Sequence, residues 1–215
     1  MKQNQKNMKF IIGLVAALMI TGSAFAQHGN SSEGHVNFGI KGGLNVYNVH
    51  NDNGVNYDAK LGFNIGLLGH IHIARQFAIQ PEVVFSTQGA KYTNVNGSIS
   101  RYNLNYINVP VMVQYMWDNG FRIEAGPQAG FMVSAKTETN DVTVNNSDNV
   151  KHIDLGVGVG LGYVHPATGL GIDARYNLGL SNINENSDVK STNRGFQVGL
   201  FYIFGHDAKK AMEGK

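Results

Sequence analysis

Beyond residue 35, apolar side chains occupy every second position over long stretches, which is the period of a β-strand. In the last stretch, residues 194–204, these positions hold Phe196, Val198, Leu200, Tyr202 and Phe204. The same alternation predicts eight strands in all. They cover residues 36–46, 61–73, 77–88, 99–117, 121–135, 151–164, 170–180 and 194–204.

The segments between these strands are alternately long and short. Long polar segments rich in Asn, Asp and Thr cover residues 47–60, 89–98, 136–150 and 181–193. Short turns cover residues 74–76, 118–120 and 165–169, and the second contains the hairpin dipeptide Asn119-Gly120. This layout is typical of an eight-stranded antiparallel up-and-down transmembrane β-barrel, with short periplasmic turns and long outer loops.

The apolar face of the predicted strands carries almost no charge and ends in aromatic residues. One end has Phe77, Tyr115, Trp117, Phe121, Tyr163, Tyr202 and Phe204, and the other has Phe63, Phe85, Tyr92, Tyr102 and Phe131. Two such aromatic belts are expected at the two surfaces of a membrane. The alternative is a soluble barrel of lipocalin type with its apolar face turned inward. The uncharged face and the two belts favour the membrane barrel.

The N-terminus has the three parts of an export signal. They are a basic region with Lys2, Lys6 and Lys9, an apolar run over residues 10–20, and the small-x-small site Ala24-Phe25-Ala26. The run is short for a membrane anchor, which is the alternative. We therefore expect a cleaved signal peptide at 1–26, a flexible lead at 27–35, the barrel at 36–204 and a periplasmic tail at 205–215.

Charge and cysteine content exclude several classes of function. The signal peptide holds three of the 17 Lys and Arg residues and none of the 15 Asp and Glu residues, so the mature chain is close to neutral. We therefore expect no nucleic-acid partner. The chain has no cysteine, which excludes disulfides, thiolate metal sites and lipid attachment through an N-terminal cysteine.

Six charged residues fall on the face opposite the apolar one, in the half of the barrel nearest the short turns. They are Lys41, Glu82, Arg122, Glu124, Asp173 and Arg175. An eight-stranded barrel has an interior just wide enough for side chains to fill. Because unpaired buried charges are costly, the sequence predicts a charge-balanced plug in the lumen. The alternative is a gate whose ion pairs rearrange to pass small solutes.

Two other patterns suggest a ligand site. The glycines between residues 156 and 162 alternate strictly, unlike a G-x-G-x-x-G phosphate loop, and should make room for long neighbours such as Arg175. His70 and His72 share a strand face but have no evident third ligand. We expect no metal site and no cofactor.

An enzyme is the second class of protein to consider. Ser134, His152 and Asp154 lie toward the outer ends of neighbouring predicted strands, where a lipid hydrolase would need them. All three should point into the lumen, whereas a lipid substrate would approach from outside. We therefore expect no catalytic residues.

Three segments resemble the PorT-like family of outer-membrane β-barrel proteins. They are residues 38–45 (FGIKGGLN), 106–115 (YINVPVMVQY) and 121–130 (FRIEAGPQAG). Asn108 stands where that family often has Glu. The resemblance covers nearly all of the mature chain and implies an eight-stranded barrel in the outer membrane. The family's namesake is linked to protein secretion across that membrane.

The sequence thus predicts a non-enzymatic, integral outer-membrane protein with a structural or surface-interaction role carried by its outer loops. The expected partners are outer-membrane lipid and the outer-membrane insertion machinery. The first alternative is an accessory component of a secretion system, with secretion-system proteins as partners, and the second is a small-solute channel.

Phe204 is the expected terminal aromatic for recognition by the insertion machinery. Substituting Phe204→Ala should lower the amount of heat-modifiable protein in the outer-membrane fraction, because the closing strand then lacks its last aromatic side chain. Deleting residues 208–215 is the control and should leave assembly unchanged. The reverse result would move the insertion signal into the tail.

Overall fold

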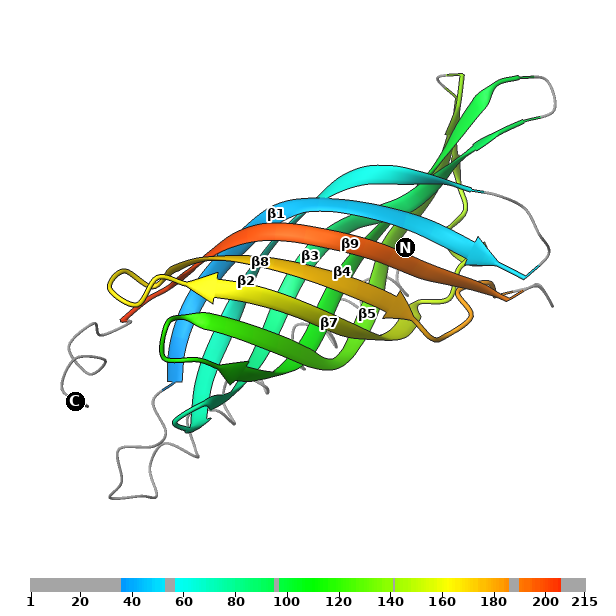
Figure 1. Cartoon of the computed structure of the whole chain (residues 1–215). Helices are drawn as coiled ribbons and strands as arrows, with labels where there is room; N and C mark the ends of the chain where they lie inside the picture. Colours follow the sequence, from blue (N-terminus) through cyan, green and yellow to red (C-terminus); the bar gives the residue numbers. More distant parts are fainter. Residues whose placement is uncertain (1–35, 53–56, 95–96, 141, 186–189, 206–215) are drawn as a thin grey trace.

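A ring of eight antiparallel strands forms the body of the protein (Figure 1). The computed structural model describes residues 36–52, 57–94, 97–140, 142–185 and 190–205. The ring strands are β1 (Val36–Asn51), β2 (Asp58–Ala74), β3 (Phe77–Thr93), β4 (Ile99–Met116), β5 (Phe121–Thr139), β7 (Ile153–Val164), β8 (Leu170–Gly179) and β9 (Ser191–Ile203). The predicted eight-stranded up-and-down barrel is confirmed.

The ring closes where the last strand pairs with the first. β9 and β1 pair antiparallel from Gly39–Ile203 to Asn51–Ser191, and the backbone N–H of Phe204 donates to the Phe38 carbonyl at 2.7 Å. Each remaining ring strand pairs with its neighbours in the chain. Every ring strand therefore has a partner on both sides, and the ring has no free edge.

The two faces of the ring differ as the alternation predicts. Outward apolar side chains such as Leu44, Ile65 and Leu200 are each about 60 % exposed, while polar and charged side chains fill the interior. The lipocalin-type arrangement is therefore wrong, because its apolar face would be buried. The outward faces of the ring strands form one apolar band around the barrel.

The apolar band ends at the same level on neighbouring strands. On β3 the outward positions change from Phe85 to Thr87, and on β4 they change from Ile107 to Asn105. Thr87 and Asn105 are cross-strand partners, so the change occurs at one height. We call this side of the barrel the loop end and the side with the short turns the turn end.

The turn end carries the better-formed aromatic belt. The rings of Phe77, Tyr115, Trp117 and Phe121 follow one another with centroids 5.2, 4.9 and 6.2 Å apart. At the loop end, Phe63 and Phe85 pair at 6.0 Å.

Two residues assigned to the outer belt are placed differently. Tyr102 shares the inward face of β4 with buried Leu104, and Tyr92 shares the inward face of β3 with buried Ala90. The prediction was wrong for both, because they lie beyond the apolar band, where no lipid draws the aromatic rings outward.

Several strands run further at the loop end than the sequence predicts. β1, β3 and β5 extend past their predicted ends, and residues 136–150 include β6 (Val142–Asn145) and η1 (Ser147–Asn149) instead of a plain loop. These segments have polar, loop-like compositions, but neighbouring strands supply their backbone hydrogen bonds. The loop-end parts of β3, β4 and β5, together with β6, project beyond the loop ends of the other strands (Figure 1). We call this region the extension.

Several predictions fall on residues that the structure does not describe. The signal peptide, the lead and most of the tail lie outside the described residues, which begin at Val36 and end at Gly205. Within the described ranges, no helix is long and apolar enough to cross a membrane.

Candidate functional site

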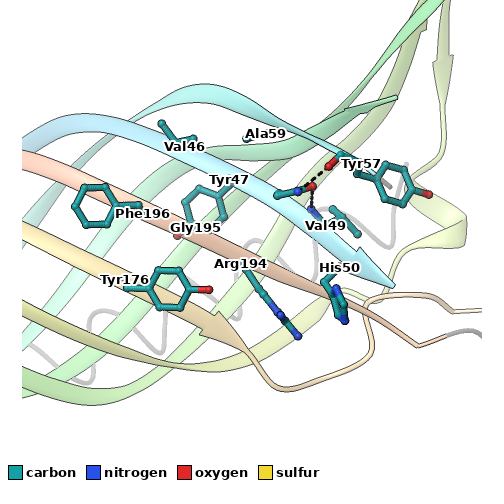
Figure 2. Close-up of a pocket in the computed structure, with 11 residues that line it drawn as sticks. Val46, Tyr47, Val49, His50, Tyr57, Ala59, Tyr176, Arg194, Gly195 and Phe196 are labelled. Carbon is teal, nitrogen blue, oxygen red and sulfur yellow. Dashed lines mark hydrogen bonds between the residues drawn. The ribbon is translucent and has the colours of Figure 1, made fainter. Parts of the chain in front are cut away.

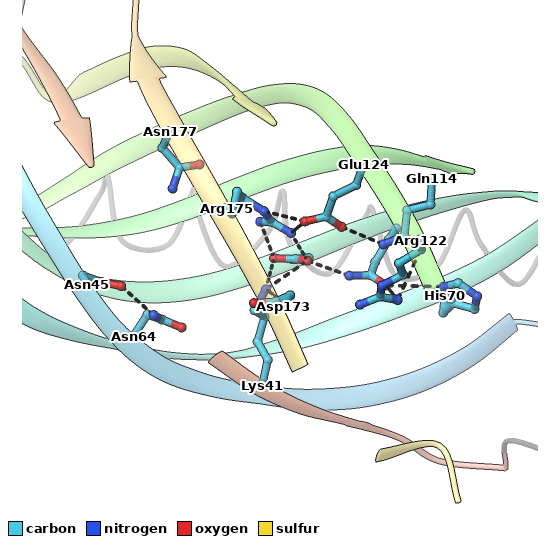
Figure 3. A network of polar contacts seen from close by, with 12 residues as sticks. Lys41, Asn45, Asn64, His70, Gln114, Arg122, Glu124, Asp173, Arg175 and Asn177 are labelled. Carbon is cyan, nitrogen blue, oxygen red and sulfur yellow. Dashed lines mark hydrogen bonds and ion pairs between the residues drawn. The ribbon is translucent and has the colours of Figure 1, made fainter. Parts of the chain in front are cut away.

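The six charged residues predicted for the lumen lie together in its turn-end half (Figure 3). They come from β1, β3, β5 and β8, and each is at most 6 % exposed. Alternation brings them inward, because neighbouring positions on each strand point outward.

Arg175 is the centre of the cluster. Its guanidinium binds both carboxylate oxygens of Glu82, at 2.9 and 3.0 Å, and reaches Oε1 of Glu124 at 2.7 Å. The Nε of Arg175 also donates to Glu124 at 2.8 Å. This two-pronged geometry is the strongest form of ion pair that arginine makes.

Lys41 extends the network across the lumen. Its Nζ lies 3.2 Å from Oε2 of Glu82 and 3.0 Å from Oδ2 of Asp173. An unbroken series of ion pairs therefore runs from Asp173 through Lys41, Glu82 and Arg175 to Glu124, and it joins four strands.

Arg122 is placed differently from the other two cations. Its Nη1 has only long hydrogen bonds, to Gln80 at 3.4 Å and to Gln114 at 3.5 Å. Its guanidinium carbon lies 4.1 Å from the centre of the Phe201 ring, which is within cation–π range. Within the described residues Arg122 has no ion pair, so the expected pairing of all six charges is wrong for this residue.

The sequence analysis missed two glutamines that complete the network. Gln80 donates to Glu82 at 2.7 Å, and Gln114 donates to Glu124 at 2.8 Å. Their carbonyl oxygens face Arg122, so each glutamine connects this arginine to a carboxylate. The only signal in the sequence was that both glutamines occupy inward positions near the charged residues. An uncharged amide at such a position does not indicate which group it will bind.

The glycines of β7 provide the space for the cluster, as predicted. A Cβ on Gly158 would lie 3.3 Å from the Arg175 side chain, and one on Gly160 would lie 3.0 Å from Glu124. A Cβ on Gly162 would lie 3.0 Å from Nε of Arg122. Large residues at these positions would displace the charged side chains.

An apolar layer lies on the turn-end side of the cluster. It consists of Leu68, Val164, Phe201 and Ile203, each at most 9 % exposed. Phe201 and Ile203 are the two apolar residues that interrupt the alternation of β9. They point inward, where they cover the charged residues.

A second apolar cluster lies on the loop-end side of the lumen. It consists of Val49, Ala90, Leu104, Tyr106, Met132, Ala135, Val150 and Ile183. Between it and the charges lies a layer of amides and hydroxyls, in which Asn45 bonds Ser86 at 2.9 Å and Asn177 bonds the Tyr47 hydroxyl at 2.9 Å. Sequence reasoning missed this cluster, because Val49, Val150 and Ile183 belonged to predicted loops.

The residues considered for catalysis do not meet. Asp154 accepts hydrogen bonds from Ser181 and Asn193, both at 2.8 Å, and Ser134 accepts one from Asn105 at 2.9 Å. His152 is exposed, although it was expected to point into the lumen. The inward prediction is wrong for two of the three residues. Ser134 pairs with outward Asn105, because a register shift between β4 and β5 turns it to the outer face. His152 lies before the first residue of β7.

The two histidines considered for a metal are packed against each other. The ring centres of His70 and His72 lie 4.7 Å apart, and Nδ1 of His70 lies 3.3 Å from Oε1 of Gln80. In the described part of the chain, no three His, Asp or Glu side chains are grouped to hold a metal ion.

Phe204 lies just past the end of β9, at the turn end. Its ring is half exposed on the outside of the barrel and lies 5.2 Å from the Tyr202 ring.

A family model described as "Outer membrane protein beta-barrel domain" matches residues 25–185. The chain belongs to this family. No curated protein has a matching sequence. The turn end of this outer-membrane barrel is thus its periplasmic end, and the loop end faces outside the cell.

Two solved outer-membrane proteins share the fold. Neisserial surface protein A is 13 % identical, with a TM-score of 0.53, and the match covers 77 % of this chain and 96 % of that one. Ail, the attachment invasion locus protein of Yersinia pestis, is 18 % identical with a TM-score of 0.50, and the match covers 80 % and 99 % of the two chains. At this identity the likeness establishes the fold alone.

Arg175 is the best position to test the energetics of the cluster. Arg175→Met leaves Glu82 without one cation and Glu124 without its ion pair, so the free energy of unfolding should fall by about 3–5 kcal/mol. The measurement is urea unfolding in lipid vesicles, followed by the fluorescence of Trp117, the single tryptophan.

The matched control is Arg75→Met. Arg75 forms an exposed ion pair with Asp118 at 3.2 Å, and its loss should cost less than about 1 kcal/mol. Equal losses for the two variants would contradict a stabilising role for the buried network.

Proposed function

We propose that this protein is a closed, non-enzymatic outer-membrane barrel whose role is carried by the extension outside the cell. The observation that carries the proposal is the filling of the lumen at successive levels. Side chains of the periplasmic apolar layer, the charged cluster, the amide layer and the outer apolar cluster are all buried. A path for solutes would have to displace each level in turn.

The charged cluster is the proposed plug. Its five paired residues are held by ion pairs of 2.7–3.2 Å from four strands, so opening a path would separate charges that water does not reach. Separating buried ion pairs is costly. This supports a fixed structural role over a gate.

The extension offers the surface for interaction. Across its inward face, one register row contains Tyr92, Ser100, Thr139 and Val142, and the next contains Ala90, Tyr102, Thr137 and Val144. Val142 is 64 % exposed and Val144 is 53 % exposed. Tyrosine is enriched in protein-binding surfaces, and the exposed valines on the same face add apolar area that a partner could bury.

Two properties of the extension suit a binding surface. Among the described strands, β6 pairs only with β5, which leaves its other edge open to an added strand. The Tyr102 hydroxyl can donate a hydrogen bond, because a tyrosine is protonated at neutral pH even at its ordinary pKa. Burial, with smaller effects of Tyr57 and Tyr92, raises the pKa of Tyr102 further, to about 12.

The second candidate is an accessory role in protein secretion. The segments at residues 38–45, 106–115 and 121–130 support it, since they resemble the PorT-like family. In this role the extension or the barrel wall would contact secretion-system proteins. For either role, the proposed route to the membrane uses a cleaved signal peptide at 1–26 and recognition of Phe204 by the insertion machinery.

Conductance separates a closed barrel from a channel. In planar lipid bilayers the purified protein should give no conductance steps. The double variant Phe201→Ala/Ile203→Ala, which opens the periplasmic apolar layer, should also be silent, because the charged and outer apolar levels remain. Reproducible steps from the unaltered protein would overturn the closed plug and favour the small-solute channel.

Proximity labelling on intact cells tests the extension. The double variant Val142→Ser/Val144→Ser should lose the proteins labelled by the unaltered barrel, because it removes the exposed apolar side chains of β6. The control is Ile99→Ser, which removes a side chain 58 % exposed on the other face of the extension. Unchanged labelling in the double variant would contradict the proposal.

Retention of secreted cargo in cells that lack the protein would favour the accessory role.

A further inference from the structure

A pocket lies on the outside of the barrel, away from the lumen and the extension's inward face. Its volume is about 350 Å³. Residues of β1, β8 and β9 and of the start of β2 line it (Figure 2). Nothing in the closed lumen or in the proposed surface role uses this pocket.

The pocket lies at the level where the apolar band ends. Val46 and Phe196 are cross-strand partners and are each about 45 % exposed on the outward face. The next outward pair toward the loop end is Asn48 with Arg194. The lining therefore changes from apolar to polar at the height of the outer membrane–water interface.

Arg194 supplies the charge of the pocket. The Nε of Arg194 is buried and has no hydrogen-bond partner among the described residues, and no ion pair of Arg194 is found there. The lining contains His50 and no carboxylate. A partly buried cation without a counter-charge favours an anionic ligand.

The other polar groups leave Arg194 as the main donor. The Asn48 amide is already engaged, since its Nδ2 donates to the Tyr57 carbonyl at 2.8 Å. Tyr176 lies beside Phe196 on β8, and its hydroxyl and the Arg194 guanidinium lie on the same side of the strands in Figure 2. One cation, one hydroxyl and an adjacent apolar surface match the chemistry of an anionic lipid.

We propose that this pocket binds the phosphate of an outer-leaflet lipid, with an acyl chain of that lipid along Val46, Phe196 and Tyr176. The planar guanidinium of Arg194 would bind two phosphate oxygens at once, a geometry that arginine favours. Val46 and Phe196 line the pocket from the outward face, so its apolar part is continuous with the apolar band. A water-soluble anion would leave that apolar part uncovered.

Retention of defined lipids on the intact protein tests the site. Protein purified from its membrane is equilibrated in phosphatidylcholine vesicles that contain either phosphatidic acid or diacylglycerol, which lacks the phosphate. Native mass spectrometry then measures the bound probe lipid. Phosphatidic acid should be retained at least about tenfold more than diacylglycerol, as expected for a charge-assisted arginine–phosphate contact.

Variants assign the retention to the pocket. Arg194→Ala should abolish the preference for phosphatidic acid, and Arg194→Lys should restore part of it. The control Arg75→Ala removes the same charge at an exposed periplasmic turn and should retain the full preference. Heat-modifiable migration establishes that each variant is folded. Equal preference in Arg194→Ala and Arg75→Ala would overturn the site.

A final comparison distinguishes a lipid site from a site for free phosphate. Inorganic phosphate added at the concentration of the probe lipid should not displace phosphatidic acid, because it makes no contact with Val46 or Phe196. Full displacement would overturn the lipid assignment. This outcome is independent of the conductance and labelling results, because the pocket lies outside both the lumen and β6.

Discussion

Backbone hydrogen bonding in lipid is the constraint on which the rest of this structure depends. A strand surrounded by hydrocarbon has no water to satisfy its N–H and C=O groups, so every strand needs a partner on each side. Pairing of β9 with β1 meets this condition by closing the ring. Closure at eight strands then sets a narrow lumen, and that width decides which side chains the interior can hold.

The narrow lumen makes the charged residues depend on one another. Arg175 can lie in the centre because Glu82 and Glu124 reach it from two other strands and because β7 presents glycines on its inward face. Arg122 lacks such a carboxylate and lies against Phe201 and two glutamines instead. The interior thus stabilises its cations in two ways. Arg175 is held by ion pairs, whereas Arg122 is held by an aromatic ring and two side-chain amides.

The outer surface divides into parts that meet different surroundings. The apolar band contacts lipid, the extension extends past the lipid, and the Arg194 pocket lies at the boundary between them. A polar residue at this boundary can contact lipid headgroups. The apolar band faces hydrocarbon instead, and the extension faces water. Both proposed binding sites therefore lie at the boundary or beyond it, and the role proposed for the lumen charges is structural.

The sequence by itself determined the barrel, because strict alternation and the spacing of turns are local properties. It also determined which face is apolar and which six charges point inward, since alternation sends every second side chain to the same side. Only the tertiary structure decided how the charges pair, because that depends on register between strands as distant as β3 and β8. The continuation of strands through polar segments 47–51 and 136–139 likewise required neighbouring strands to supply hydrogen bonds, which composition does not reveal. The pocket at Arg194 arises from β1, β8 and β9 meeting at one height, a coincidence of register that no single stretch of sequence contains.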